Sequence, residues 1–264
     1  MVNPKGRSLG PQPRTSKPSI RIAAIGDIHC NKASQGVLAP LLSQMSDRAD
    51  VLLVCGDLTD YGLPEEADIF AREWAATVTI PTVAVLGNHD YESGQADAVQ
   101  KILSDAGLII LDGDSCEVRG VGFAGVKGFA GGFGNRALQP WGEECIKRFV
   151  REGVDEALKL ESALARLGTA QRIAVLHYAP IRETVEGEPA EIIPFLGSSR
   201  LEAALDRYPV NAVFHGHAHH GCPYGETKGT IPVYNVAMPL LRRLYPDRLP
   251  FHLFELPAVP TTVE

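Results

Sequence analysis

Short apolar runs that alternate with helical patterns constrain the fold of this chain more than any other feature. Each of three runs ends at, or directly precedes, a glycine that is followed by a polar residue: Ile20–Gly26, Asp50–Cys55 and Thr82–Leu86. Three segments of helical periodicity separate and follow them: Ala33–Met45, Glu65–Ala76 and Gly94–Ala106. Continuous apolar strands between helices are typical of βαβ units, whose parallel strands are buried on both faces. Because connections in such units are right-handed, we expect the three carboxyl ends at one edge of a sheet.

The second half of the chain predicts more strands and one long helix. After an apolar run at Leu108–Leu111, a hairpin is predicted from Cys116–Arg119 and Val121–Val126, and an amphipathic helix from Trp141–Leu167. Four further strands are predicted: Arg172–Leu176, Ala212–Phe214, Pro232–Val236 and Phe251–Glu255. Since neither a linker nor a repeat of fixed period divides the chain, we expect one domain over residues 20–264, with a variable region at 113–170.

Charge and composition restrict the classes of function. The formal net charge of −7 argues against a protein that coats nucleic acid, so nucleic acid is an unlikely partner. The first 26 residues contain five basic residues and no acidic one, and residues 1–19 predict a disordered basic tail. A basic arm for nucleic acid or membrane is the alternative for this tail. No apolar stretch approaches the length of about 18 residues that a membrane span requires, so no membrane partner is expected.

The cysteines indicate a cellular compartment. The five cysteines are widely spaced and never form a C-x-x-C pair, which is typical of reduced thiols. We therefore expect a cytoplasmic protein. The oligomeric state stays open.

Residues able to bind a metal follow five of the predicted strands. They form the segments Gly26-Asp27-Ile28-His29, Gly56-Asp57-Leu58-Thr59-Asp60, Gly87-Asn88-His89-Asp90, the single His177, and His215-Gly216-His217. Each segment alone has a plain structural explanation, since Gly-Asp after a strand is also a common helix N-cap. Their joint occurrence at strand ends indicates a metal site instead. Mixed oxygen and imidazole ligands favour Mn, Fe, Zn or Co over Ca or Mg.

These segments resemble the calcineurin-like metallophosphoesterase superfamily, whose pattern runs D-x-H, G-D-x-x-D, G-N-H-D/E, a lone H and G-H-x-H. The resemblance covers about residues 20–236 and implies a four-layer αββα sandwich with a two-metal site. It implies Asp27, His29 and His217 as ligands of the first metal, Asn88, His177 and His215 as ligands of the second, and Asp57 as the bridge. It also implies His89 as the catalytic histidine and Asp60 as the carboxylate that orients it. Asp90 is expected to be structural.

The reaction expected from this resemblance is hydrolysis of a small-molecule phosphoester. Two divalent or mixed-valence transition-metal ions (Mn, Fe, Zn or Co) would activate a bridging hydroxide for in-line attack while His89 assists the leaving oxygen. Protein Ser/Thr phosphatases of the superfamily carry Arg where Tyr61 follows Asp60, and the G-D-I-H and G-H-A-H segments are similar to a small cyclic-nucleotide-phosphodiesterase-like branch. A phosphodiester is therefore the favoured substrate. A phosphomonoesterase, or a non-catalytic scaffold on the same fold, is the alternative.

The variable region is expected to determine specificity. Phe129, Phe133 and Trp141 surround a glycine-rich segment, where they either stack on an aromatic group of the substrate or pack the long helix against the sheet. We expect Gly128–Gly134 to act as a mobile lid. Lys127 and Arg136 are candidates for phosphate contacts. His219 and His220 are interpreted as rim residues outside the ligand set.

Overall fold

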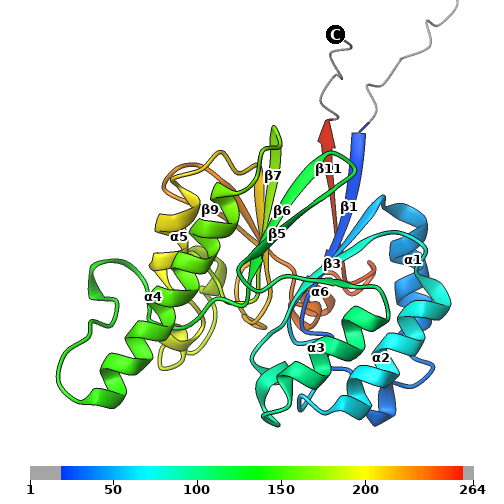
Figure 1. Cartoon of the computed structure of the whole chain (residues 1–264), viewed down its shortest axis with the longest axis horizontal. Helices are drawn as coiled ribbons and strands as arrows, with labels where there is room; N and C mark the ends of the chain where they lie inside the picture. Colours follow the sequence, from blue (N-terminus) through cyan, green and yellow to red (C-terminus); the bar gives the residue numbers. More distant parts are fainter. Residues whose placement is uncertain (1–18, 258–264) are drawn as a thin grey trace, which may run out of the picture.

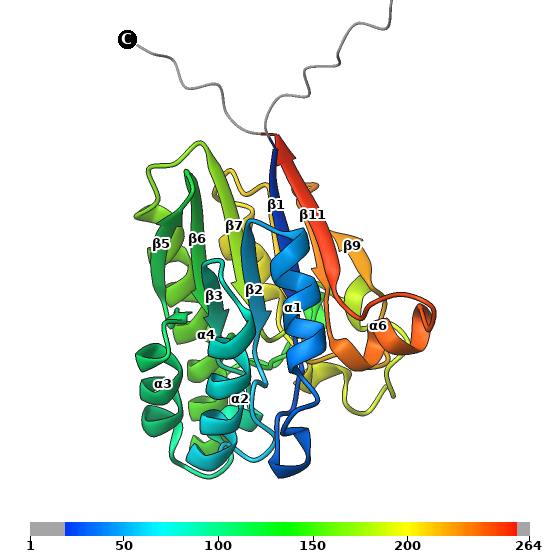
Figure 2. The same cartoon turned by 90° about the vertical axis from the view of Figure 1, so that its right-hand side faces the viewer.

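A computed structural model describes residues 19–257, and two sheets form its centre. The first sheet has the order β11-β1-β2-β3-β4. Its strands are β1 (Ser19–Ile25), β2 (Val51–Cys55), β3 (Thr82–Val85), β4 (Ile109–Ile110) and β11 (His252–Pro257). β1 to β4 are parallel, and β11 runs antiparallel beside β1 at the edge of the sheet (Figure 2). The predicted βαβ arrangement of the first half is confirmed.

The second sheet has the order β5-β6-β7-β8-β10-β9. Its strands are β5 (Asp114–Val118), β6 (Val121–Val126), β7 (Gln171–Leu176), β8 (Ala212–His215), β9 (Tyr224–Glu226) and β10 (Pro232–Asn235). β6, β7, β8 and β10 are parallel, whereas the two edge strands β5 and β9 are antiparallel to their neighbours. The carboxyl ends of the central strands of each sheet therefore lie together at one edge of that sheet.

Helices cover the outer face of each sheet, which gives four layers (Figure 1). The first sheet carries α1 (Ala39–Arg48), α2 (Pro64–Thr77) and α3 (Ala96–Asp105), and the second carries α4 (Glu144–Ala165) and α5 (Ser199–Leu205). α6 (Met238–Leu244) follows β10. Five short 3-10 turns complete the described elements: Lys32–Ser34, His89–Tyr91, Gly134–Arg136, Glu183–Val185 and Ile193–Phe195. The αββα sandwich expected from the resemblance is confirmed.

Successive side chains of each strand point to opposite faces of its sheet, so each sheet contributes to two separate hydrophobic cores. In β2, Leu52 and Val54 face the core beneath α1 to α3, while Leu53 and Cys55 face the core between the two sheets. Phe123 and Ile173 reach that same inner core from the second sheet. A third core lies between the second sheet and α4 with α5. Because both faces of the strands are buried, their sequences are continuously apolar.

The structure differs from the sequence-based prediction in the segment before α1. Ala33–Met45 was predicted as one helix, but a 3-10 turn ends at Ser34 and α1 begins at Ala39. Gly36 adopts a left-handed φ of 79°, which interrupts the helix, and Pro40 lies in the first turn of α1, where a missing N–H is tolerated. The helix predicted at Trp141–Leu167 begins later, at Glu144. The predicted tail lies outside the described residues, apart from Ser19, which begins β1.

Within residues 19–257, no helix combines the length and the apolar character needed to cross a bilayer.

Candidate metal centre

The strand ends of the two sheets are hydrogen-bonded to one another. The Nδ1 atom of His177, which follows β7, lies 2.9 Å from the carbonyl oxygen of Cys55 at the end of β2. The backbone N–H of Gly26, after β1, donates to the carbonyl oxygen of Val236 at 2.9 Å. These contacts bring the motif residues of both sheets to one edge of the sandwich.

Three groups of potential metal ligands form at this edge. Within each group the ligand atoms lie within 4.8 Å of one another: Asp27 with His29 and His219; His29 with Asp57 and His89; Asp57 with His177 and His217. Asp57 connects the second group to the third. Its Oδ1 lies 3.4 Å from Nε2 of His177, and its Oδ2 lies 3.8 Å from Nε2 of His29. The Oδ1 atom of Asn88 is 2.8 Å from Nε2 of His177, which places the amide beside the third group.

Backbone strain is concentrated in these groups. Among residues 19–257, six non-glycine residues have a left-handed φ, and four of them belong to the groups: Asp27 (57°), His29 (48°), Asp57 (49°) and His217 (69°). Such conformations cost free energy and persist where surrounding structure imposes them, as at functional sites. Two glycines allow close approach, since a Cβ on Gly87 would overlap Oδ1 of Asp57 and one on Gly216 would overlap Oδ2 of Asp27.

The donor atoms fit a transition-metal pair. Both ring nitrogens of His29 are buried and have no hydrogen-bond partner among residues 19–257. Burial lowers the pKa of His29 and His177, and it lowers the pKa of His217 to about 3, so these imidazoles are in the neutral form that binds metals. Burial, together with the charges of Asp27 and Asp90, raises the pKa of Asp57 well above its ordinary value. A bound cation would relieve this repulsion between buried carboxylates.

The last histidine motif is shifted by two residues relative to the sequence-based assignment. His217 takes the place expected of His215 beside His177, and His219 takes the place expected of His217 beside Asp27. Both ring nitrogens of His215 are engaged elsewhere, because Nδ1 lies 2.8 Å from the carbonyl oxygen of Gly216 and Nε2 lies 2.8 Å from Oγ1 of Thr184. The structure thus places His215 outside the three groups of potential ligands, in contrast to the role that the resemblance implies.

The sequence itself indicates which two histidines of this motif belong to the ligand groups. In Gly216-His217-Ala218-His219, the G-H-x-H pattern matches both histidines that the structure brings to the groups, whereas His215 precedes the glycine. The Nε2 atom of His219 lies 3.0 Å from Oδ1 of Asp27. Burial lowers the pKa of His219, but the hydrogen bond and the charge of Asp27 outweigh burial and raise it overall.

His89 and Asp60 meet in a different way from that implied by the resemblance. The Nδ1 atom of His89 lies 2.6 Å from the main-chain carbonyl oxygen of Asp60. The Asp60 carboxylate instead lies 3.4 Å from Nδ1 of His29 and accepts a hydrogen bond from Nδ2 of Asn31 at 3.2 Å. The orienting contact to His89 thus comes from the backbone of residue 60, and the carboxylate faces a candidate ligand.

Asp90 connects two of the motif loops. Its fully buried carboxylate accepts hydrogen bonds from the backbone N–H groups of Leu58, Thr59 and Gly87, and from Oγ1 of Thr59. A buried carboxylate satisfied in this way has no free oxygen for a metal. The structure agrees with the structural role expected of Asp90.

The glycine-rich segment is tied to its surroundings. The N–H of Gly128 donates to Oε2 of Glu156 at 2.7 Å, and the N–H groups of Gly131 and Gly132 donate to carbonyl oxygens of Pro194 and Gly197, each at 2.9 Å. These bonds do not support a lid that moves by itself over Gly128–Gly134. The segment just after it, before α4, projects from the body of the molecule (Figure 1).

The three aromatic residues of the variable region have different surroundings. The ring of Phe129 packs 5.0 Å from that of Phe149 in α4, as expected of core packing. Phe133 is partly buried against a small apolar cluster, whereas Trp141 is 59% exposed. The Lys127 ammonium donates to the carbonyl oxygen of Gly128 at 3.0 Å and lies over three aromatic rings.

Comparisons with known proteins agree with this fold. The chain resembles the crystal structure of a phosphopantetheinyl hydrolase from Mycobacterium tuberculosis, with a TM-score of 0.64 and 15% identity, covering 93% of this chain and 98% of that one. It also resembles the protein TT1561 of Thermus thermophilus, with a TM-score of 0.54 and 16% identity, covering 85% and 92% of the two chains. A search of curated proteins finds no significant match. The sequence matches the model of one family, described as calcineurin-like phosphoesterase, over residues 20–221. The chain therefore belongs to the calcineurin-like phosphoesterase family, whose members hydrolyse phosphoesters with the help of metal ions.

Proposed function

We propose that this protein hydrolyses a small-molecule phosphodiester with two transition-metal ions (Mn, Fe, Zn or Co). One ion would be held by Asp27, His29 and His219, the other by Asn88, His177 and His217, with Asp57 shared between them. When bound, such a pair supplies Lewis acidity to the phosphate and lowers the pKa of the attacking water. The observation that carries the proposal is the position of Asp57, whose two carboxylate oxygens face ligands of both groups.

The proposed role of His89 is to assist the leaving oxygen. Its side chain is partly exposed, and its backbone N–H donates to Oδ1 of Asp57 at 2.9 Å, which keeps the residue beside the candidate bridge. The carbonyl oxygen of Asp60 accepts a hydrogen bond from a protonated Nδ1 of His89 and fixes the ring. The other ring nitrogen is then available to donate a proton or hydrogen bond, a role typically worth about 10²–10⁴-fold in rate.

The charge around the centre favours a diester over a monoester. Among the described residues, no lysine or arginine nitrogen lies within 4 Å of the carboxylate oxygens of Asp27, Asp57 or Asp60. Lys127 lies farther away, and its charge adds to burial in lowering the pKa of His177. A phosphomonoester is a dianion near neutral pH and gains from such a cation, whereas a phosphodiester carries a single charge. Tyr61 also occupies the place where protein phosphatases of the superfamily carry an arginine.

The test compares two chromogenic esters after metal loading. The protein is stripped with chelator, reloaded with Mn²⁺, and assayed on bis-p-nitrophenyl phosphate and p-nitrophenyl phosphate. We expect two ions per chain and a higher kcat/KM for the diester. A monoester preference would support the phosphomonoesterase alternative. Protein that takes up metal and hydrolyses neither ester would support the non-catalytic scaffold.

We also propose that the protein works in the cytoplasm. All five cysteines are free thiols in the structure, and Cys30 and Cys55 are buried. Unpaired thiols are the usual state in a reducing compartment. The proposal is tested by localising the tagged full-length chain in cell fractions.

A further inference from the structure

A cavity of about 390 Å³ lies between the variable region and residues 182–195, where the glycine-rich segment meets the start of α4. Four aromatic rings and two arginines contribute to its lining: Phe133, Arg136, Trp141, Phe149, Arg182 and Phe195. Apolar walls with a few charged groups are typical of pockets for small organic molecules.

The cavity adjoins the candidate metal centre at Phe195. Phe195 belongs to both, because its carbonyl oxygen lies 3.4 Å from Nε2 of His217 while the residue also lines the cavity. A second connection runs through packed rings. The Tyr178 ring lies 4.4 Å from that of His217 and 5.8 Å from that of Phe129, which in turn lies 5.0 Å from Phe149. Phe195 is therefore the side on which the organic group of a phosphoester bound at the metals would meet the cavity.

Two exposed aromatic side chains remain available for a ligand. Trp141 is 59% exposed and Phe195 is 56% exposed, although large apolar side chains are usually buried. Phe149, in contrast, packs against Phe129 and supplies a fixed wall. Flat rings with one free face are suited to stack on a planar aromatic group.

The two arginines add positive charge to a chain that is acidic overall. Within the described residues, no carboxylate oxygen lies within 4 Å of the Arg136 guanidinium. Arg182 makes one long contact, 3.9 Å from Nε to Oε1 of Glu186, between two largely exposed side chains. Both guanidinium groups are thus free to bind an anion, which arginine does with two parallel hydrogen bonds.

We propose that this cavity binds the organic group of the substrate, and that this group is a planar aromatic ring carrying a second anionic substituent. The inference rests on the proposed function, since the metal centre would hold the reacting phosphate. Trp141 and Phe195 stack on the ring, and Arg136 and Arg182 bind the second anion. The cavity thereby selects among phosphoesters that the metals alone would treat alike.

The experiment uses three phosphonates that cannot be hydrolysed: methylphosphonate, phenylphosphonate and 4-carboxyphenylphosphonate. Their phosphonate groups are alike, so differences in affinity report on the organic group. Binding to the Mn²⁺-loaded protein is followed by tryptophan fluorescence in a Trp74→Phe background, where Trp141 is the remaining tryptophan. Inhibition constants against bis-p-nitrophenyl phosphate provide a second measurement in the unmodified protein.

We expect phenylphosphonate to bind roughly tenfold tighter than methylphosphonate, and to change Trp141 fluorescence. The carboxyl group should add roughly another fivefold. Phe195→Ala should remove the difference between phenyl and methyl, and Arg136→Gln the gain from the carboxyl group. In each case the constant for methylphosphonate should stay within about twofold, because the variants leave the metal ligands intact.

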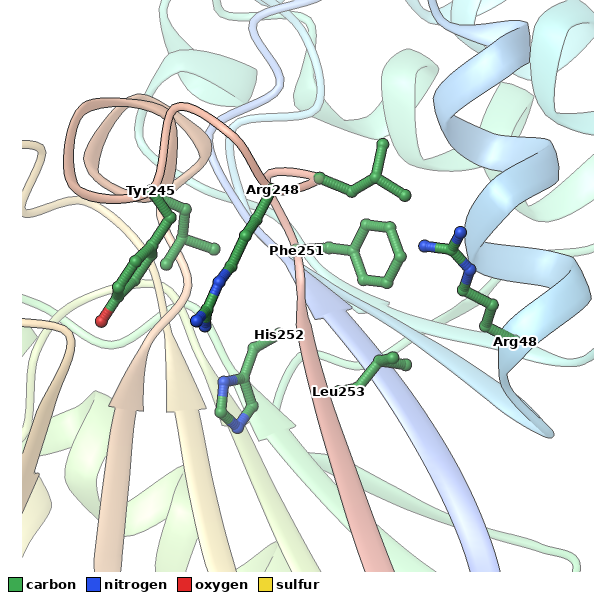
Figure 3. A pocket seen from close by; sticks show the side chains of 8 residues that line it. Arg48, Tyr245, Arg248, Phe251, His252 and Leu253 are labelled. Atoms are coloured by element: carbon green, nitrogen blue, oxygen red, sulfur yellow. The ribbon is translucent and has the colours of Figure 1, made fainter.

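Matched controls come from a separate cavity of about 430 Å³ between α1, α6 and β11, lined by Tyr245, Arg248 and Phe251 among others (Figure 3). Tyr245→Ala and Arg248→Gln should leave all three affinities unchanged.

Equal affinities for the three phosphonates, or differences that survive Phe195→Ala and Arg136→Gln, would overturn the inference. If bis-p-nitrophenyl phosphate is still hydrolysed in that case, the proposed function stands. If the expected differences appear without hydrolysis, the proposed function fails and the cavity remains a binding site.

Discussion

The Nε2 atom of His219 lies 3.0 Å from Oδ1 of Asp27, although 192 positions separate the two residues in the sequence. This contact places His219 in the ligand group of Asp27 and His29. We expect His219→Ala to reduce bound metal from two ions per chain to one, measured by plasma mass spectrometry after Mn²⁺ loading. Hydrolysis should fall by about 100-fold or more, because loss of one ion removes charge stabilisation at the phosphate.

His215 provides the matched control for this prediction. His215→Ala removes one of the two buried partners of Oγ1 of Thr184 and opens space beneath β8, so we expect a loss of about 2–4 kcal/mol in the free energy of unfolding. Metal content should stay at two ions per chain while the protein is folded. The shifted register is wrong if His215→Ala loses an ion and His219→Ala keeps both.

A second prediction separates the roles of His89 and Asp60. His89→Ala should keep two ions and lower kcat by about 100-fold or more, since it removes the group proposed to assist the leaving oxygen. Asp60→Asn should weaken Mn²⁺ binding by about 10–100-fold, because its carboxylate lies beside the ring of His29. At saturating Mn²⁺, the kcat of Asp60→Asn should stay within about threefold of the parent, since its main-chain carbonyl still orients His89.

These two variants can be told apart by titrating Mn²⁺ and following both affinity and kcat. Asn31→Ala removes the hydrogen bond that holds the Asp60 carboxylate, and should weaken Mn²⁺ binding in the same direction. Loss of metal in His89→Ala would make His89 a ligand, which its place in the group with His29 and Asp57 also allows. A large drop in kcat for Asp60→Asn with metal retained would restore the role that the resemblance implied for its carboxylate.

A third prediction concerns the anchoring of the glycine-rich segment. Glu156 is 2% exposed, and its carboxylate accepts hydrogen bonds from the N–H of Gly128 and from the Lys159 ammonium. We expect slow amide exchange at Gly128 in the parent protein. Glu156→Ala should speed this exchange by about tenfold or more and lower the free energy of unfolding by about 1–3 kcal/mol.

The control for this variant lies one turn earlier on the same helix. The Glu152 side chain is exposed and makes no hydrogen bond or ion pair within the described residues, so Glu152→Ala should leave exchange at Gly128 unchanged. Fast exchange at Gly128 in the parent would favour the mobile lid instead.

Much of the fold followed from local patterns in the sequence. β2 and β3 are continuously buried because helices and the other sheet cover both faces, and their largely apolar sequences predict buried parallel strands directly. The break before α1 was missed because helical periodicity continues through Gly36, whose positive φ is a property of the turn. The short helices α5 and α6 span seven residues each, too few to show a period.

Prediction of the candidate site from the sequence is limited in a different way. The motifs identified which strand ends carry metal-binding residues, and the glycine of the G-H-x-H pattern separates His217 and His219 from His215, but the alternation of side chains along β8 does not. A β-strand sends alternate side chains to opposite faces, so positions 215, 217 and 219 all share the parity that the motif requires. β8 ends at His215, and the chain then turns through the left-handed His217. That turn, which spacing alone does not specify, directs His217 and His219 to different ligand groups.

The last prediction tests an ion pair that links the start of β1 to the start of β2. The Asp50 carboxylate accepts hydrogen bonds from the backbone N–H of Arg21 at 2.9 Å and from its Nε at 3.3 Å. Burial alone would raise the pKa of Asp50, but the hydrogen bonds and charge of Arg21 outweigh it and lower the pKa. The carbonyl oxygen of Asp50 also accepts a hydrogen bond from Nε of Arg119, in the second sheet's β5–β6 turn.

Because the pKa of Asp50 is lowered in the folded state, the contribution of this residue to the free energy of unfolding decreases as the pH falls. A carboxyl group whose pKa is lower in the folded state binds fewer protons there than in the unfolded chain. Its contribution is present in full above the unfolded pKa of about 3.9 and is lost as the pH falls through the folded value. We expect Asp50→Asn to destabilise the chelated, metal-free protein by about 1 kcal/mol at pH 7, measured by urea unfolding. The difference should shrink as the pH falls below about 3.9, whereas Asp68→Asn, at an exposed position of α2, should change little over the same range. A difference that stays constant down to pH 3 would show that the Asp50 charge does not stabilise the fold.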